Sequence, residues 1–319
     1  MTSNSDERER WLLDQMTKSE FFHQKLHEYG LLEVAYAIES TKGEDLDWNR
    51  KDERRTLNIS ETAWNKVIHR GIKPVCVFAH PDVLQNVRRS VGYYQKMAMV
   101  SLKSMTRIGL TIDRYEAGEN KKPLDRQKAC EISQRLNKLI SRLIEADDEI
   151  DSREFDLWRG MTAGSTAQGS WQNRKGERAE EIVKGVVTRR IQGTELLTDR
   201  GNDGKTIHLK DGRIIEYGSE PDIAFYDQDR HVLAAVEIKG GIDTAGILER
   251  IGAALKSLSR VKQENPNAVT ILVTYQVSMT DQAEEELASH QGDIDHWFAI
   301  EDVLDRDDVR QEIFQVLNI

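Results

Sequence analysis

The sequence predicts an α/β protein, with a helical N-terminal region followed by a core in which helices flank a mixed sheet. Through the first 150 residues, apolar side chains recur every three or four positions, as at Leu136, Ile140 and Leu143, and this spacing is typical of helices. Beyond about residue 170, short runs with strand character alternate with helical stretches. The expected order in this second half is αβββαβαβα, which favours a sheet covered by helices on both faces.

The N-terminal region is expected to consist mainly of long helices. The predicted helices are 6–29, 60–70, 81–103 and 125–150. Residues 160–169 are small, polar and rich in glycine, a composition that commonly separates two organised regions. We therefore expect a domain boundary here, with the helical region at 1–160 and the α/β core at 161–319.

The core is predicted to begin with a helix at 174–192, which carries Ile182, Val183 and Val186 on one side. A polar turn at 227–230 joins two strands and predicts an antiparallel hairpin. The strand at 269–274 is largely apolar, as in sheets that are buried on both faces. The remaining predicted elements are strands 213–217, 222–226, 232–239 and 297–300, and helices 245–264, 281–290 and 301–317.

The composition excludes a membrane protein. Of the 319 residues, 31% are charged and 38% are hydrophobic, and no run approaches the roughly 18–20 apolar residues that a spanning helix needs. Residues 1–10 are polar and charged where a signal peptide would be apolar, so we expect a cytoplasmic protein with no membrane partner. Cys76 and Cys130 cannot by themselves form a disulfide framework or a zinc site.

The net charge of −10 would ordinarily argue against a nucleic-acid partner. Residues 281–319, however, contain 12 acidic and 2 basic residues, so the first 280 residues are electrically neutral. Net charge bears on solubility more than on any one site, and a neutral body can still hold a local basic cleft. Nucleic acid therefore remains a possible partner.

Three charged residues are expected to meet at one end of the predicted hairpin. Asp222 begins one strand, while Glu237 and Lys239 end the other. The two-residue period of a strand places Glu237 and Lys239 on one face, with roughly 7 Å between their Cα atoms. Val236 and Ile238 then project from the opposite face into a core. The sequence thus predicts two carboxylates and one ammonium group in a small volume.

This group of residues favours metal-assisted hydrolysis of a phosphodiester. Two carboxylates, from Asp222 and Glu237, together with the backbone carbonyl of Ile238, suit a partly hydrated Mg²⁺ ion. Lys239 could orient or deprotonate the attacking water, or stabilise charge on the phosphate. Triplets of an acid, any residue and lysine are common, however, and a salt bridge on an exposed hairpin face is the competing interpretation.

At these residues the chain resembles the PD-(D/E)XK nuclease superfamily, because Pro221, Asp222, Glu237 and Lys239 fill that motif in its usual order. The resemblance implies a restriction-endonuclease-like core that binds Mg²⁺ through Asp222 and Glu237 and uses Lys239 at the attacking water.

The resemblance also implies an auxiliary carboxylate on the helix before the first strand. In many of these nucleases a glutamate four residues after a glycine faces the metal, and Glu180 stands in that relation to Gly176. Glu181 is the alternative candidate for this auxiliary carboxylate. An exposed acidic helix start, favoured by the helix dipole, is an equally good interpretation of both.

A narrower likeness covers roughly residues 70–319. Segments 77–81, 93–94 and 100–105 look like a helical block that precedes the catalytic core of several type II restriction endonucleases. The run from Lys239 to Gly252 is similar to the XcyI type in particular. This resemblance implies a homodimer that cuts both strands of a short palindrome in double-stranded DNA, with GC-rich CCCGGG as the typical site, and it assigns DNA recognition or dimerisation to the helical region.

Candidate DNA contacts come from local charge. Residues 171–190 contain six basic and three acidic side chains, and Arg174 and Lys175 are expected at a helix N-terminus, where backbone N–H groups favour phosphate. Arg250 and Lys256 lie on the polar side of the helix at 245–264, where a merely solvated face is equally consistent, and Lys103 lies in the helical block. The residues that would read bases are not predictable from one sequence.

Two other functions stay open at this stage. One is a structure-specific repair or junction nuclease, and the other is a non-catalytic DNA-binding protein in which Asp222, Glu237 and Lys239 form a structural ion pair. A nucleotide cofactor is not expected, because a Walker loop ending at Gly204-Lys205-Thr206 would need glycine at position 199, which is aspartate.

Overall fold

The computed structural model describes residues 4–43, 46, 48, 51–112, 115, 124–201, 204–242 and 244–319. The chain forms two compact units, one of residues Arg8–Ser170 and the other built on Trp171–Ile319. The first unit is helical and the second is α/β, so the predicted fold class is confirmed.

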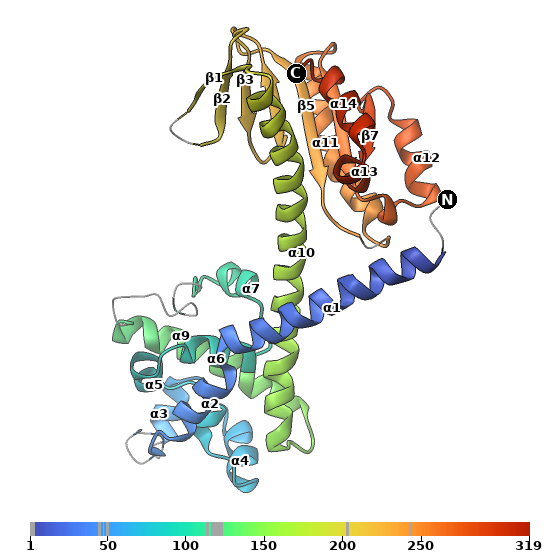
Figure 1. Ribbon diagram of the computed structural model, residues 1–319. Helices are drawn as coiled ribbons and strands as arrows, with labels where there is room; N and C mark the ends of the chain where they lie inside the picture. Colours follow the sequence, from blue (N-terminus) through green and yellow to red (C-terminus); the bar gives the residue numbers. More distant parts are fainter. Residues whose placement is uncertain are drawn as a thin grey trace. The chain divides into compact units, whose positions relative to one another are not determined.

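The helical unit is organised around a long central helix, α9 (Arg126–Ala146), against which α4, α5 and α6 pack. Ile132, Leu136 and Ile140 form its buried stripe, because residues four apart lie on one face of a helix. Other described helices of the unit are α1 (Asn4–Tyr29), α2 (Leu31–Glu39), α3 (Lys51–Thr56), α4 (Glu61–His69), the short 3-10 helix η2 (Pro74–Cys76), α5 (Pro81–Asn86), α6 (Ser90–Met97) and α7 (Leu102–Arg107) (Figure 1).

The single helix predicted at 81–103 is wrong, because the structure divides this segment into α5, α6 and α7. Arg89 and Met99 adopt positive φ angles of 63° and 53°, which no continuous helix accommodates. Ser101 then caps α7 by accepting a hydrogen bond from the Ser104 amide at 3.1 Å. The apolar residues that predicted one long helix continue across these breaks, because α6 is buried on all sides.

In the second unit the described strands form one seven-stranded sheet in sequential order (Figure 1). Strands β1 to β5 are antiparallel neighbours, whereas β5, β6 and β7 are parallel, so the predicted mixed sheet is confirmed. The strands are β1 (Leu197–Arg200), β2 (Thr206–Leu209), β3 (Ile214–Tyr217), β4 (Ile223–Tyr226), β5 (Val232–Lys239), β6 (Val269–Thr274) and β7 (His296–Ala299).

Helices cover both faces of this sheet. Val236 and Ile238 of β5 pack into a core with α10 (Ser152–Gly193) and α14 (Asp307–Val316), while Ala235 packs into a second core with α11 (Ile247–Glu264). This division follows from the alternation of side chains along a strand. The remaining elements are the 3-10 helix η3 (Gln276–Ser278), α12 (Asp281–Ser289) and α13 (Ile300–Asp305).

Two predicted details of the core need correction. Strands β1 and β2 were not predicted, because each has four residues and β1 is mostly exposed. The helix predicted at 301–317 is interrupted at Arg306, whose φ and ψ of −118° and 118° are those of extended backbone, so α13 and α14 are separate.

The glycine-rich stretch 160–169 does not interrupt the chain, because it lies inside the 42-residue helix α10. The two compact units divide at residues 170 and 171, within that same helix, rather than at the predicted position 160. Phe155, Ala163 and Ala167 are buried along α10, and their packing offsets the cost of about 1 kcal/mol that each glycine imposes on a helix.

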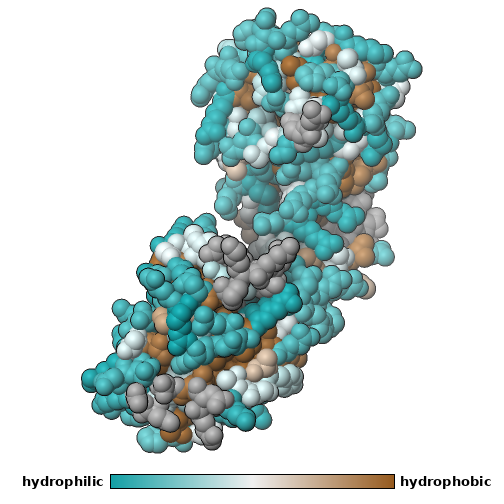
Figure 2. All heavy atoms as spheres, turned by 90° about the vertical axis from the view of Figure 1, so that its left-hand side faces the viewer, coloured by the Kyte–Doolittle hydropathy of each residue, from teal (hydrophilic) through white to brown (hydrophobic). Residues whose placement is uncertain are grey.

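The surface is that of a polar protein. In the described part of the chain, no helix combines the length and the apolar character needed to cross a membrane. On the face drawn in Figure 2, hydrophilic side chains predominate and hydrophobic ones form small patches.

Candidate active site

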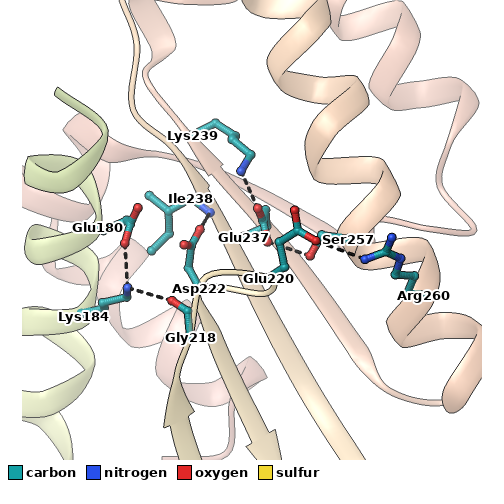
Figure 3. A network of polar contacts seen from close by, with 10 residues as sticks. All are labelled: Glu180, Lys184, Gly218, Glu220, Asp222, Glu237, Ile238, Lys239, Ser257 and Arg260. Atoms are coloured by element: carbon teal, nitrogen blue, oxygen red, sulfur yellow. Dashed lines mark hydrogen bonds and ion pairs between the residues drawn. The ribbon is translucent and has the colours of Figure 1, made fainter. Parts of the chain in front are cut away.

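The β4–β5 hairpin brings the predicted acidic residues together. Ile223 pairs with Val236, so Asp222, directly before β4, lies across from Glu237. Asp222 is 4% exposed, and its Oδ2 accepts a hydrogen bond of 2.7 Å from the Ile238 amide (Figure 3). The sequence-based expectation that the hairpin would bring Asp222 to the end of β5 is therefore confirmed.

Glu237 and Lys239 share one face of β5, but that face is not open to solvent. Helix α11 packs on β5, and Glu237 is only 1% exposed. Glu237 Oε1 forms an ion pair with Lys239 Nζ, whose side chain is 23% exposed (Figure 3). This burial contradicts the competing interpretation of a salt bridge on an exposed hairpin face.

Ser257 completes the surroundings of Glu237 and was not predicted. This buried residue of α11 donates a hydrogen bond of 2.8 Å from Oγ to Glu237 Oε2, so each oxygen of the glutamate has a partner. In the sequence, the only sign of this role is that Ser257 stands beside Leu258, in the apolar stripe of the helix. Serine is common in such stripes.

Glu180 approaches the same region from α10. It forms an ion pair of 2.7 Å with Lys184, and Lys184 Nζ also lies 3.5 Å from the carbonyl oxygen of Gly218, shortly before β4 (Figure 3). The Glu180 side chain is 34% exposed, whereas its rival Glu181 is an exposed residue with no place in this network.

A close approach of backbone to backbone sets the distance between α10 and the end of β5. A Cβ atom added at Gly240 would lie 2.6 Å from Ala179 Cβ and 2.6 Å from the Lys175 carbonyl oxygen. Only glycine fits at such a contact. Gly240 therefore allows α10 to pack beside the strand that carries Glu237 and Lys239, with Glu180 adjacent to the point of contact.

The electrostatics of the site are those of crowded negative charge. Burial and, after it, the charges of Glu237 and Glu180 raise the pKa of Asp222 to about 7, although the hydrogen bond from Ile238 and the charge of Lys239 act to lower it. Carboxylate oxygens are hard ligands, and a divalent cation would relieve this repulsion. The donor set of Asp222 and Glu237 thus fits a magnesium-like ion.

The predicted DNA contacts come from three helices, and one argument for them was wrong. Arg174 and Lys175 lie deep inside α10, which begins at Ser152, so their amides belong to the helix interior and are not free for phosphate. Lys175 Nζ lies 5.3 Å from the centre of the Trp171 ring. Their side chains remain candidates for contact with DNA.

The other three candidates lie on α11 and α7. Arg250, in the first turn of α11, is half-buried beside Gly241, where an added Cβ would lie 2.7 Å from its Nη1. Lys256 is exposed on the same helix, and Lys103 is exposed on α7 in the helical unit.

Among the described residues, a second group of possible metal ligands lies in the turn after β4, at the opposite end of the hairpin from Asp222. Asp227, Asp229 and His231 bring their ligand atoms within 4.8 Å of one another. Asp227 Oδ1 already accepts hydrogen bonds from the amides of His231 at 2.8 Å and Asp229 at 2.9 Å. These bonds are those of an ordinary polar turn, and we assign the group no role in catalysis.

Comparison with family profiles identifies a related family. The sequence profile of the XcyI restriction endonuclease family matches residues 24–318, a span that includes the whole candidate site. No curated protein matches the chain.

The raised pKa of Asp222 predicts how stability depends on pH. A carboxyl whose pKa is higher in the folded state favours folding in acid, and this contribution is lost as the pH rises from about 4 to about 7. Asp222→Asn removes the ionisation but keeps an oxygen that can accept from Ile238. In EDTA at pH 8 we expect the variant to unfold at a higher temperature than the wild type, with the difference shrinking toward pH 4.

The matched control for this experiment is Asp227→Asn. The hydrogen bond from the His231 amide holds the pKa of Asp227 below its usual value, so its ionised form favours folding. This control should be less stable than the wild type at neutral pH, and the deficit should shrink in acid. If Asp222→Asn were also less stable than the wild type at neutral pH, with the deficit shrinking in acid, the description of the site as crowded negative charge would be contradicted.

Proposed function

The chain belongs to the XcyI restriction endonuclease family, and from this premise we propose that it is a type II enzyme whose catalytic centre is the Asp222, Glu237 and Lys239 cluster. Membership makes the protein a site-specific nuclease that acts on DNA. We assign the catalytic centre to this cluster because two buried carboxylates and a lysine lie together at one end of the β4–β5 hairpin, inside the matched span.

We further propose that the reaction depends on Mg²⁺. Asp222 and Glu237, with the backbone carbonyl of Ile238, would hold the ion. When bound, Mg²⁺ would polarise a phosphoryl oxygen and make a coordinated water more acidic. The raised pKa of Asp222 supports this proposal, because a cation would offset the repulsion between the carboxylates.

The roles of the side chains follow from their contacts. Lys239, paired with Glu237 Oε1, would orient the attacking water or stabilise the negative charge that develops on the phosphate. Ser257 fixes the other oxygen of Glu237 and so limits the orientations of that carboxylate. Glu180 would be an auxiliary carboxylate, held by Lys184.

The proposed substrate is a short palindrome in double-stranded DNA, GC-rich like CCCGGG, and the proposed assembly is a homodimer. Two copies related by a two-fold axis would present one site to each strand, because the symmetry of the protein then mirrors that of the DNA. The proposed phosphate contacts are the side chains of Lys103, Arg174, Lys175, Arg250 and Lys256.

Digestion of a long unmethylated DNA of known sequence tests this function. We expect discrete fragments with Mg²⁺, none with EDTA, and one common palindromic sequence at the ends when the fragments are sequenced. Cutting at branched or damaged DNA alone would instead indicate a structure-specific nuclease. Binding of duplex DNA without cutting, with Mn²⁺ as well as Mg²⁺, would indicate a non-catalytic protein.

Variants in the same digestion separate catalysis from stability. Lys239→Ala should lower the cleavage rate by about 10²–10⁴-fold, the usual contribution of a group that acts on proton transfer or on developing charge, while DNA binding persists. Lys262→Ala is the matched control, because Lys262 lies on α11 and forms an ion pair of 2.7 Å with Asp295, directly before β7. Equal, small effects of the two variants would favour a purely structural role for Lys239.

Ser257→Ala tests the positioning of Glu237. Removing a partner that orients a metal ligand typically costs about 10–100-fold in metal affinity or activity. We expect the Mg²⁺ concentration for half-maximal cleavage to rise within that range, while Ser259→Ala, two residues along the helix, leaves it unchanged. The same Mg²⁺ dependence in wild type and Ser257→Ala would show that the hydrogen bond does not position the ligand.

A further inference from the structure

Two histidines of the helical unit stand one helical turn apart on α1. His23 and His27 are both exposed, and their Nε2 atoms lie 3.3 Å apart, with 4.6 Å between the ring centres. Residues four positions apart on a helix are neighbours on one face, so the helix places the two rings side by side. Neither residue belongs to the nuclease site.

The distance between the two nitrogens equals the distance between two ligand atoms bound to the same transition-metal ion. Two imidazole nitrogens bound at about 2.0–2.1 Å to a tetrahedral ion stand about 3.3–3.4 Å apart. We propose that His23 and His27 form a binding site for a divalent transition-metal ion of the Zn²⁺ class. Two protein ligands leave the other positions of such an ion to water, so the site is an open one.

The ligand chemistry distinguishes this site from the nuclease centre. Imidazole suits Zn²⁺, Ni²⁺ and Cu²⁺, whereas Mg²⁺ prefers oxygen ligands. Without an ion, one ring N–H donates to the nitrogen of the other ring. With an ion, both Nε2 lone pairs bind it and each neutral ring carries its proton on Nδ1, so no net proton is released.

Two lysines lie near the pair in the sequence, and each contacts another side chain. Lys25, which lies between the two histidines in sequence, forms an ion pair with Glu28 and lies 5.5 Å from the centre of the Phe21 ring. Lys18 lies over the Phe22 ring, 5.4 Å from its centre. Both ammonium groups are thus engaged with other side chains. An ion bound across this turn would stabilise the C-terminal part of α1.

Calorimetric titration of the full-length protein without a histidine tag tests the proposal. Zn²⁺ is titrated at pH 7.5 in saturating Mg²⁺, which occupies oxygen-rich sites. We expect one Zn²⁺ site, whose affinity falls at least tenfold in both His23→Asn and His27→Asn. The melting temperature should rise with Zn²⁺ in the wild type and not in these variants, because an ion that binds only the folded helix stabilises it.

The control variant is His231→Asn, which removes the imidazole from the turn that holds Asp227 and Asp229, another group through which Zn²⁺ could bind. It should leave the titration unchanged. Loss of the Zn²⁺ site in His231→Asn, or its survival in both His23→Asn and His27→Asn, would overturn the proposal. Both residues of the pair are exposed, so circular dichroism is expected to show that the variants remain folded.

Discussion

The hydrogen bond from the Ile238 amide to the Asp222 carboxylate is the contact on which the candidate active site depends. It joins the residue before β4 to the end of β5 and so fixes which residues face each other across the hairpin. A slip of one residue would turn Glu237 and Lys239 to the opposite face of the sheet. The parallel pairing of β5 with β6 buries the same strand on its other side and holds the register.

Burial gives this cluster its chemical character. Asp222 and Glu237 are both buried, and helices cover both faces of the sheet that carries them. Lys239 and Ser257 each satisfy one oxygen of Glu237, while the pKa of Asp222 rises to about 7. A divalent cation bound here would relieve the repulsion between the two carboxylates.

The hairpin and its acidic residues could be predicted because two-residue alternation and a polar turn are local signals. Strand β1 could not, since a short exposed strand has no apolar pattern. The sequence did not predict that α10 is continuous. Packing of residues such as Ala163 and Ala167 outweighs the low helix propensity of the nearby glycines, and local composition does not record that packing. Ser257 was missed because its role comes from a contact between α11 and β5, which no local pattern records.

Anomalous diffraction from crystals grown with Mn²⁺, an ion that takes the ligands of Mg²⁺ and scatters strongly, tests the central claim most directly. The account predicts an anomalous peak bound by the carboxylates of Asp222 and Glu237, and no such peak in Asp222→Asn. A peak at the turn of Asp227, Asp229 and His231, with none between Asp222 and Glu237, would contradict it.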